Sequence, residues 1–126
     1  MMQDEKIIIL YGEYEGRDVI KKEIKKLPDK NFQRRAIAMI ETFISGDIRN
    51  TKNVISIKDT YELKYFKIRV ILCHVSSNIY VVTHVFTKRS DSYPKEEKEL
   101  MVDRTQEVLS KKDEIESYAI SNRKGK

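Results

Sequence analysis

Two apolar runs separated by three polar residues constrain the fold of this chain more than any other feature. The runs, residues 68–75 and 79–86, are rich in β-branched side chains, which suit a pleated and at least half-buried surface. Only the polar residues 76–78 lie between them. This spacing predicts an antiparallel β-hairpin with a very short turn.

Such a hairpin gathers positive charge at one end of a sheet. If residues 77–78 form a two-residue loop, Arg69 lies opposite Phe86 and beside Lys88. Arg89 follows directly at the exit of the second strand. Guanidinium and ammonium groups bind anions, and phosphate is the first anion to consider. The sequence therefore predicts an anion site at the open end of the hairpin.

Size and composition limit the possible classes of protein. A chain of 126 residues is long enough for one domain with a core. The net charge of +5 mildly favours an acidic partner, either nucleic acid or protein. Cys73 is the only cysteine, so the chain has no internal disulfide and no cysteine-cluster metal site, and its thiol is expected to be buried. Without a membrane-length apolar run or a secretory signal, the chain is expected to be cytoplasmic.

The remaining segments predict an α+β domain over residues 1–120, followed by a disordered basic tail at 121–126. The expected sheet is antiparallel, with two helices in the N-terminal half, one C-terminal helix, and the helices mainly on one face. Outside the hairpin, strands are predicted at residues 6–11, 54–57 and 61–66. Helices are predicted at residues 18–27, 29–45 and 94–115.

Four short motifs follow one another in the second half of the chain. They are Tyr61-Glu62-Leu63-Lys64, Ile68-Arg69-Val70, His84-Val85-Phe86-Thr87-Lys88-Arg89 and Tyr93-Pro94-Lys95-Glu96. In this order and at these separations they resemble the RelE/HigB-type toxins of bacterial type II toxin–antitoxin systems, especially the phage-derived subgroup related to HigB. The resemblance implies a RelE-like fold.

Toxins of this family cut messenger RNA, usually in the ribosomal A site, and are silenced by a cognate antitoxin. The resemblance therefore implies a ribosome-dependent endoribonuclease that inhibits translation. It also implies cleavage through the substrate's own 2′-hydroxyl, without a metal ion or another cofactor. The implied partners are the ribosome, messenger RNA and an antitoxin protein of helix-turn-helix type.

The resemblance also assigns roles to individual side chains. Arg69 would hold the scissile phosphate, while Lys88 and Arg89 would neutralise and position it. Lys64 would assist, although it stands where the family has arginine, and lysine does not reproduce a bidentate phosphate contact. Tyr93, which replaces the family's threonine, would stack a base or transfer a proton, and Tyr65 is the alternative residue for this role.

Two further residues complete the predicted site. Lys95 is an expected RNA contact at the start of the last helix. His84 matches a common family position and is interpreted as a hydrogen-bonded structural histidine, with proton transfer as the alternative. His74 and His84 are predicted on opposite faces of the sheet, so a metal ion shared between them is not expected.

Structural interpretations of the same residues stay open. Arg69 would pair with Glu62 across neighbouring strands, and Lys88 with Arg89 would form an ordinary charged strand end. The alternative function is accordingly a non-catalytic protein of phage origin, with the toxin fold, that binds RNA or a protein partner. Residue type and spacing alone do not separate the two functions.

Overall fold

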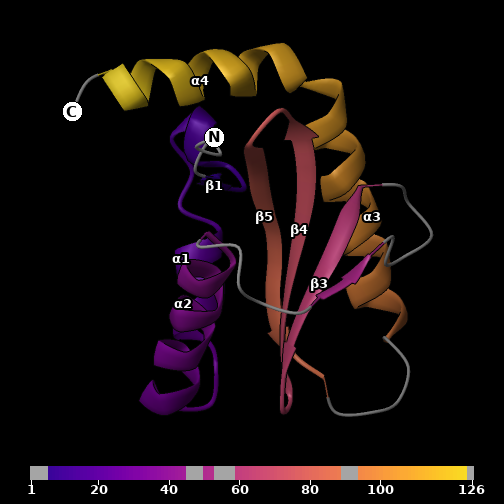
Figure 1. Ribbon diagram of the computed structural model, residues 1–126. Coiled ribbons are helices and arrows are strands. Elements are labelled where there is room, and N and C mark those ends of the chain that lie inside the picture. The colour runs from indigo at the N-terminus through magenta and orange to yellow at the C-terminus, as the bar shows by residue number, and fades with distance from the viewer. Residues whose placement is uncertain (1–5, 45–49, 53–58, 89–93, 125–126) are drawn as a thin grey trace.

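The computed structural model describes residues 6–44, 50–52, 59–88 and 94–124 (Figure 1). The elements in these segments are β1 (Ile7–Leu10), a 3₁₀ turn (Glu13–Glu15), α1 (Ile20–Lys25), α2 (Lys30–Ile44), β2 (Asn50–Lys52), β3 (Thr60–Tyr65), β4 (Ile68–Ser76), β5 (Ile79–Thr87), α3 (Lys95–Ser110) and α4 (Lys112–Lys124). The prediction of a mixed α+β class is confirmed.

The β4–β5 hairpin has the predicted two-residue loop and the predicted register. Ser76 pairs with Ile79, which leaves residues 77–78 as the turn. Two irregularities interrupt the ladder, one on each side of residues 72–74, and their shifts cancel. Arg69 therefore lies opposite Phe86, as the sequence predicted.

The sheet is mixed rather than antiparallel, which corrects the predicted architecture. Its strand order is β1-β5-β4-β3-β2. The pairs among β2, β3, β4 and β5 are antiparallel, whereas β1 runs parallel to β5, with Ile7 opposite Ile79. Two parallel neighbouring strands require a long crossover connection. Here the chain passes through every element from α1 to β4 between β1 and β5.

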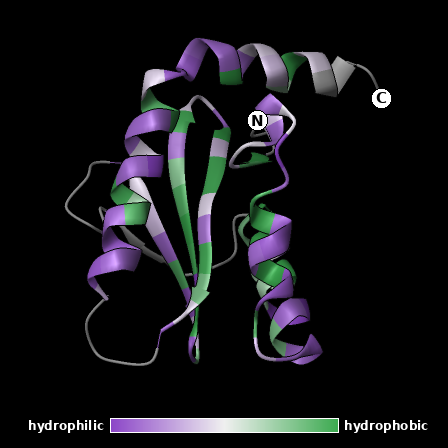
Figure 2. Cartoon of the chain, turned by 180° about the vertical axis from the view of Figure 1, so that it is seen from behind, coloured by the Kyte–Doolittle hydropathy of each residue, from purple (hydrophilic) through white to green (hydrophobic). Residues whose placement is uncertain are grey.

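Helices cover both faces of the sheet, which corrects the expectation that they lie mainly on one. Figure 1 shows α1 and α2 on one side and α3 on the other. Alternation along β4 explains this arrangement, because Val70 joins the core beneath α2, while Ile71 packs with Phe86 and with Met101 of α3. The strands are accordingly largely hydrophobic, and the helices carry hydrophilic residues as well (Figure 2).

The C-terminal part forms two helices where the sequence predicted one. Lys111 leaves helical geometry with φ −115° and separates α3 from α4. α4 then crosses the end of the sheet near the β4–β5 turn, and Ile115 and Ala119 join the main core (Figure 1). The helix runs to Lys124, through much of the segment predicted as a disordered tail.

Asp29 caps the start of α2, because its carboxylate accepts a hydrogen bond from the backbone N–H of Phe32 at 2.9 Å. The strand predicted at 54–57 lies outside the described residues. β2, at Asn50–Lys52, is a strand that the sequence did not predict.

Cys73 is fully buried, as expected for a lone thiol in an apolar strand. Burial, assisted by the negative charge of Asp59, raises the pKa of the Cys73 thiol to about 12. The thiolate, which is the reactive form, is therefore disfavoured at physiological pH. Within the described part of the chain, none of the helices is both long and apolar enough to cross a membrane.

Candidate functional site

A row of residues crosses three strands at the end of the sheet where β3 turns into β4. Lys64 on β3 lies directly opposite Arg69 on β4, and Arg69 lies opposite Phe86 on β5. Directly opposed side chains in an antiparallel pair have Cβ atoms about 5 Å apart, so the two cations are neighbours. Like charges in such a position oppose folding, and a bound anion would relieve their repulsion.

More positive charge lies beside this row. The backbone N–H of Lys88 donates to the carbonyl oxygen of Lys67 at 2.7 Å, which fixes the end of β5 against the β3–β4 turn. Between positions 60 and 88 the sequence has one acidic residue, Glu62, against Lys64, Lys67, Arg69 and Lys88. We call these four cations the basic end of the sheet. The register places Lys64 opposite Arg69, and the backbone of Lys88 lies beside the same turn.

Arg69 differs from the other members because it is buried, with 7% of its surface exposed. Its Nη1 donates to the carbonyl oxygens of Phe66 at 2.7 Å and of Ile68 at 2.9 Å. Its Nε lies 3.7 Å from Oε2 of Glu62, an ion pair without a hydrogen bond, and both atoms are otherwise unsatisfied. Arg69 thus supplies buried positive charge and braces the turn.

The other predicted site residues are not all part of this end. Lys95 begins α3, and its side chain is 89% exposed, 4.0 Å from the carboxylate of Glu99 one turn along. Arg89 and Tyr93 lie outside the described residues. The structure therefore brings three of the predicted cations together and leaves Lys95 on the exposed surface of a helix.

His84 lies on the α3 face of the sheet, 4% exposed, between two carboxylates. Its Nδ1 lies 3.0 Å from both oxygens of Glu23, and its Nε2 lies 2.6 Å from Oε2 of Glu97. Each ring nitrogen is thus within hydrogen-bonding distance of a carboxylate. The interpretation of His84 as a hydrogen-bonded histidine is confirmed. His74 instead stacks on Tyr80, which packs on Phe43 of α2, so the two histidines lie on opposite faces, as predicted.

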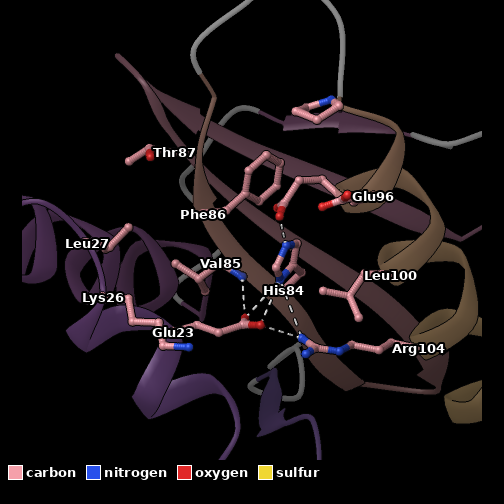
Figure 3. A pocket seen from close by; sticks show the side chains of 12 residues that line it. Glu23, Lys26, Leu27, His84, Val85, Phe86, Thr87, Glu96, Leu100 and Arg104 are labelled. Atoms are coloured by element: carbon pink, nitrogen blue, oxygen red, sulfur yellow. Dashed lines mark hydrogen bonds and ion pairs between the residues drawn. The ribbon is translucent and has the colours of Figure 1, made fainter.

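Glu23 also closes an open edge of the sheet. The β1–β5 ladder extends no further than Val82, and beyond it Glu23 accepts a hydrogen bond from the backbone N–H of Val85 at 3.0 Å. Arg104 of α3 donates to the carbonyl oxygen of Thr83 at 2.9 Å and to Oε2 of Glu23 at 2.7 Å. Figure 3 shows Glu23 and Arg104 pointing towards each other beside His84. The side chains of Glu23 and Arg104 thus make hydrogen bonds that a neighbouring strand would otherwise make at this edge.

The charge state of Glu23 follows from these contacts. Burial by itself raises the pKa of this carboxyl, but the hydrogen bond and charge of His84, the Val85 N–H and the charge of Arg104 act in the opposite direction. Their combined effect lowers the pKa of Glu23 below its ordinary value of 4.5. The carboxylate is therefore ionised at neutral pH and holds α1, β5 and α3 together.

A cavity of about 600 Å³ lies next to this cluster, between α1, the end of β5 and the start of α3. Glu23, His84 and Arg104 form part of its wall, together with Glu96 and Glu97 (Figure 3). Three carboxylates and a histidine make this cavity unsuited to a phosphate. The polar residues of this cavity connect α1 to α3. The basic end of the sheet is therefore the better candidate for an anion-binding site.

Glu23→Gln is expected to lower the free energy of unfolding by about 1–3 kcal/mol at neutral pH, because hydrogen bonds to charged groups contribute about that much. The folded-state pKa of Glu23 is depressed, so its stabilising effect is complete above pH 4.5 and declines as pH falls through the folded pKa. Urea unfolding of both proteins between pH 3 and 7 measures this. Glu99→Gln, at a 62% exposed side chain, is the matched control. If the difference in unfolding free energy between wild type and Glu23→Gln did not decrease at low pH, the stabilising role assigned to the Glu23 carboxylate would be wrong.

Sequence reasoning missed Glu23, Glu97 and Arg104. In the sequence they look like ordinary solvated positions of two helices, and their partners lie far away along the chain. The separations are 61 residues between Glu23 and His84 and 81 between Glu23 and Arg104. The one local signal was His84 itself, since a histidine inside an apolar strand requires polar partners from outside that strand.

Comparisons add no family to this picture. Nowhere among the described residues do three or more His, Cys, Asp or Glu side chains form a group that could hold a metal ion. No protein-family model matches the chain, and no curated protein matches its sequence.

Proposed function

We propose that the protein is the toxin component of a type II toxin–antitoxin system, with a RelE-like fold, and that it cleaves messenger RNA on the ribosome. The observation that supports this proposal is the basic end of the sheet. Lys64 lies opposite Arg69, Lys88 is fixed beside the same turn, and Glu62 is the one acid of the 60–88 stretch. A concentration of cations at one end of a sheet suits a phosphodiester backbone.

The proposed reaction uses the RNA's own 2′-hydroxyl. Its oxygen attacks the adjacent phosphorus while its proton passes to water, the bond from phosphorus to the 5′-oxygen breaks, and the departing 5′-oxygen takes up a proton from water. Charge accumulates on the phosphate oxygens in the transition state. Lys64 and Lys88 stabilise this charge from the surface, and Arg69 adds a buried positive charge beneath them. The cognate antitoxin covers this basic surface, which is favoured by charge complementarity.

One observation favours a second candidate function. Arg69 already donates to two backbone carbonyls and is almost fully buried, so its guanidinium has a structural role in the free protein. A protein with Arg69 so engaged would bind RNA through Lys64, Lys67 and Lys88 without cutting it. The second candidate is therefore a non-catalytic RNA-binding protein with the same fold.

Messenger RNA held in the ribosomal A site is expected to be cut, leaving a 2′,3′-cyclic or 3′-phosphate on one fragment and a 5′-hydroxyl on the other. The reason is that the cations of the basic end offer charge stabilisation to the phosphate, while the 2′-hydroxyl of the RNA is the nucleophile. Purified protein, programmed ribosomes and end-group analysis of the fragments provide the measurement. A message with a 2′-O-methyl sugar at the scissile position is the control and is expected to survive.

Other results would change the proposal. Fragments with a 5′-phosphate would contradict attack by the 2′-hydroxyl. Salt-sensitive binding of RNA, with no cleavage on or off the ribosome, would support the non-catalytic candidate. Absence of growth arrest on induced expression would count against a toxin.

A further inference from the structure

An exposed phenylalanine stands at the tip of the β3–β4 hairpin. Tyr65 pairs with Ile68, so residues 66–67 form a two-residue turn, with Phe66 as its first member. Phe66 is 69% exposed and has φ +53°, in the left-handed region that a side chain with Cβ adopts at a cost. Glycine is the usual residue at such a position. The sequence thus keeps a large apolar ring where both solvation and backbone geometry oppose it.

Phe66 belongs to a groove between this turn and the N-terminal half of α2. The groove has a volume of about 490 Å³. Phe66 meets Phe32 edge-to-face, with ring centroids 6.4 Å apart, and Tyr65 beside it is 48% exposed. We call this the aromatic groove; its lining residues are Asn31, Phe32, Arg34, Arg35, Ala38, Tyr65, Phe66 and Ile68.

The charge of the groove is entirely positive. Arg34 and Arg35 line it, and no carboxylate is among its lining residues. The guanidinium of Arg35 lies 4.2 Å from the centre of the Tyr65 ring. The ammonium of Lys67 lies 5.7 Å from the centre of the Phe66 ring. Exposed aromatic faces interleaved with cations are the combination that single-stranded nucleic acids recognise, because bases stack on the rings while cations contact phosphates.

We propose that the aromatic groove is a base-stacking subsite for single-stranded RNA, separate from the basic end of the sheet. The inference rests on the proposed function, in that both use the same ligand. The β3–β4 turn connects the two surfaces, since Lys64 and Lys67 flank the pair Tyr65 and Phe66 in the sequence. An RNA strand with a phosphate at the basic end passes over the turn and stacks a neighbouring base on Phe66.

RNA is favoured over a protein partner by charge and by the shape of the exposed group. A docking helix needs a continuous apolar strip, whereas here single rings alternate with arginines and lysines. An acidic peptide would satisfy the cations but would leave the exposed ring face without a planar partner. A nucleotide supplies both a planar base and an anion.

The chain has no tryptophan, so Phe66→Trp introduces a unique fluorescent reporter at the subsite. The probe is a short single-stranded RNA with 2′-O-methyl sugars throughout, which the proposed reaction cannot cut. Its bases are expected to quench the indole emission on binding. An abasic strand of the same length keeps the phosphates and is expected to quench far less. Ile120→Trp, at a 54% exposed position of α4, is the matched control and is expected to show no change.

Phe66→Gly tests the same subsite by affinity. Glycine accepts φ +53° without strain, so this variant is expected to keep or raise the melting temperature. Its affinity for the probe RNA is expected to fall about 10-fold, within the range for loss of one base–aromatic stack. Ile37→Ala, which removes a 47% exposed apolar side chain from the same helix as Arg34 but outside the groove, is expected to bind like wild type.

The outcomes separate this inference from the proposed function. Wild-type affinity in Phe66→Gly, or equal quenching by the abasic strand, would overturn the subsite while leaving cleavage at the basic end untouched. If Phe66→Gly lost binding to a coexpressed protein partner while its RNA affinity stayed unchanged, the groove would be a protein-binding surface. That result would also overturn the base-stacking subsite. A wild-type protein that neither binds nor cuts any RNA would remove the proposed function together with the subsite.

Discussion

Lys88→Ala is expected to lower the rate of RNA cleavage by about 10²–10³, the usual cost of removing one preorganised charge at a transition state. The backbone N–H of Lys88 holds the end of β5 to the carbonyl oxygen of Lys67, and this bond does not depend on the identity of the side chain. Removing the ammonium leaves that bond in place. Single-turnover cleavage of A-site messenger, compared with the melting temperature of each protein, is the measurement.

Two matched variants make the result specific. Lys98→Ala removes an exposed lysine of α3 that is not one of the four cations of the basic end, and it is expected to cleave at the wild-type rate. Lys88→Arg keeps the charge and is expected to retain much of the activity. Equal losses in Lys88→Ala and Lys98→Ala would show that general positive charge, rather than a positioned ammonium, drives binding.

Arg69→Ala is expected to cost about 3–5 kcal/mol of folding free energy, which is a large share of the roughly 5–15 kcal/mol that stabilises an ordinary domain. The side chains of Arg69 and Glu62 are 8% and 10% exposed. Truncating Arg69 leaves the Glu62 carboxylate buried without its counter-charge, and it frees the carbonyls of Phe66 and Ile68. Urea unfolding measures the loss.

The double variant Glu62→Gln/Arg69→Ala separates structure from chemistry. Removing the buried negative charge as well is expected to restore part of the lost stability. A double variant that is stable but does not cleave RNA would assign Arg69 to the reaction. Recovery of both stability and cleavage would limit Arg69 to bracing the turn, and Lys64 and Lys88 would carry the phosphate contact alone.

The β4–β5 hairpin was predictable because its signals are local. Apolar runs and a polar turn fix two strands, and the turn length fixes which residues face each other across them. The opposition of Arg69 and Phe86 followed from counting back from residues 77–78. The count succeeded even though the ladder has two irregularities, because their shifts cancel.

Long-range pairing was not predictable in the same way. Ile7 to Leu10 looked like a strand, but nothing nearby indicates whether it runs parallel or antiparallel to its partner. The break at Lys111 has no glycine or proline to mark it, so α3 and α4 looked like one helix. Whether one or both faces of the sheet are covered depends on the face against which α3 packs, and no local sequence pattern indicates that face.

The same difference between local and long-range signals explains which parts of the candidate site were predicted. Lys64, Arg69 and Lys88 came together because they belong to neighbouring strands of a predictable meander. The burial of Arg69 was missed, since register places a side chain on a face without indicating how deep it lies. The aromatic groove as a whole was missed too, because it joins a hairpin tip to α2, and its members Phe32 and Phe66 lie 34 residues apart in the sequence.

The closure of β5 by Glu23 and Arg104 has a consequence for association between copies of the chain. Residues 83–87, Thr-His-Val-Phe-Thr, favour a β-strand, and their outer edge carries the backbone N–H of Val85 and the carbonyl of Thr83. Without the two side chains, this edge would accept a strand from another molecule, the usual start of edge-to-edge aggregation. The ion pair therefore covers this edge against pairing with another chain, and protonation of Glu23 is expected to weaken that cover.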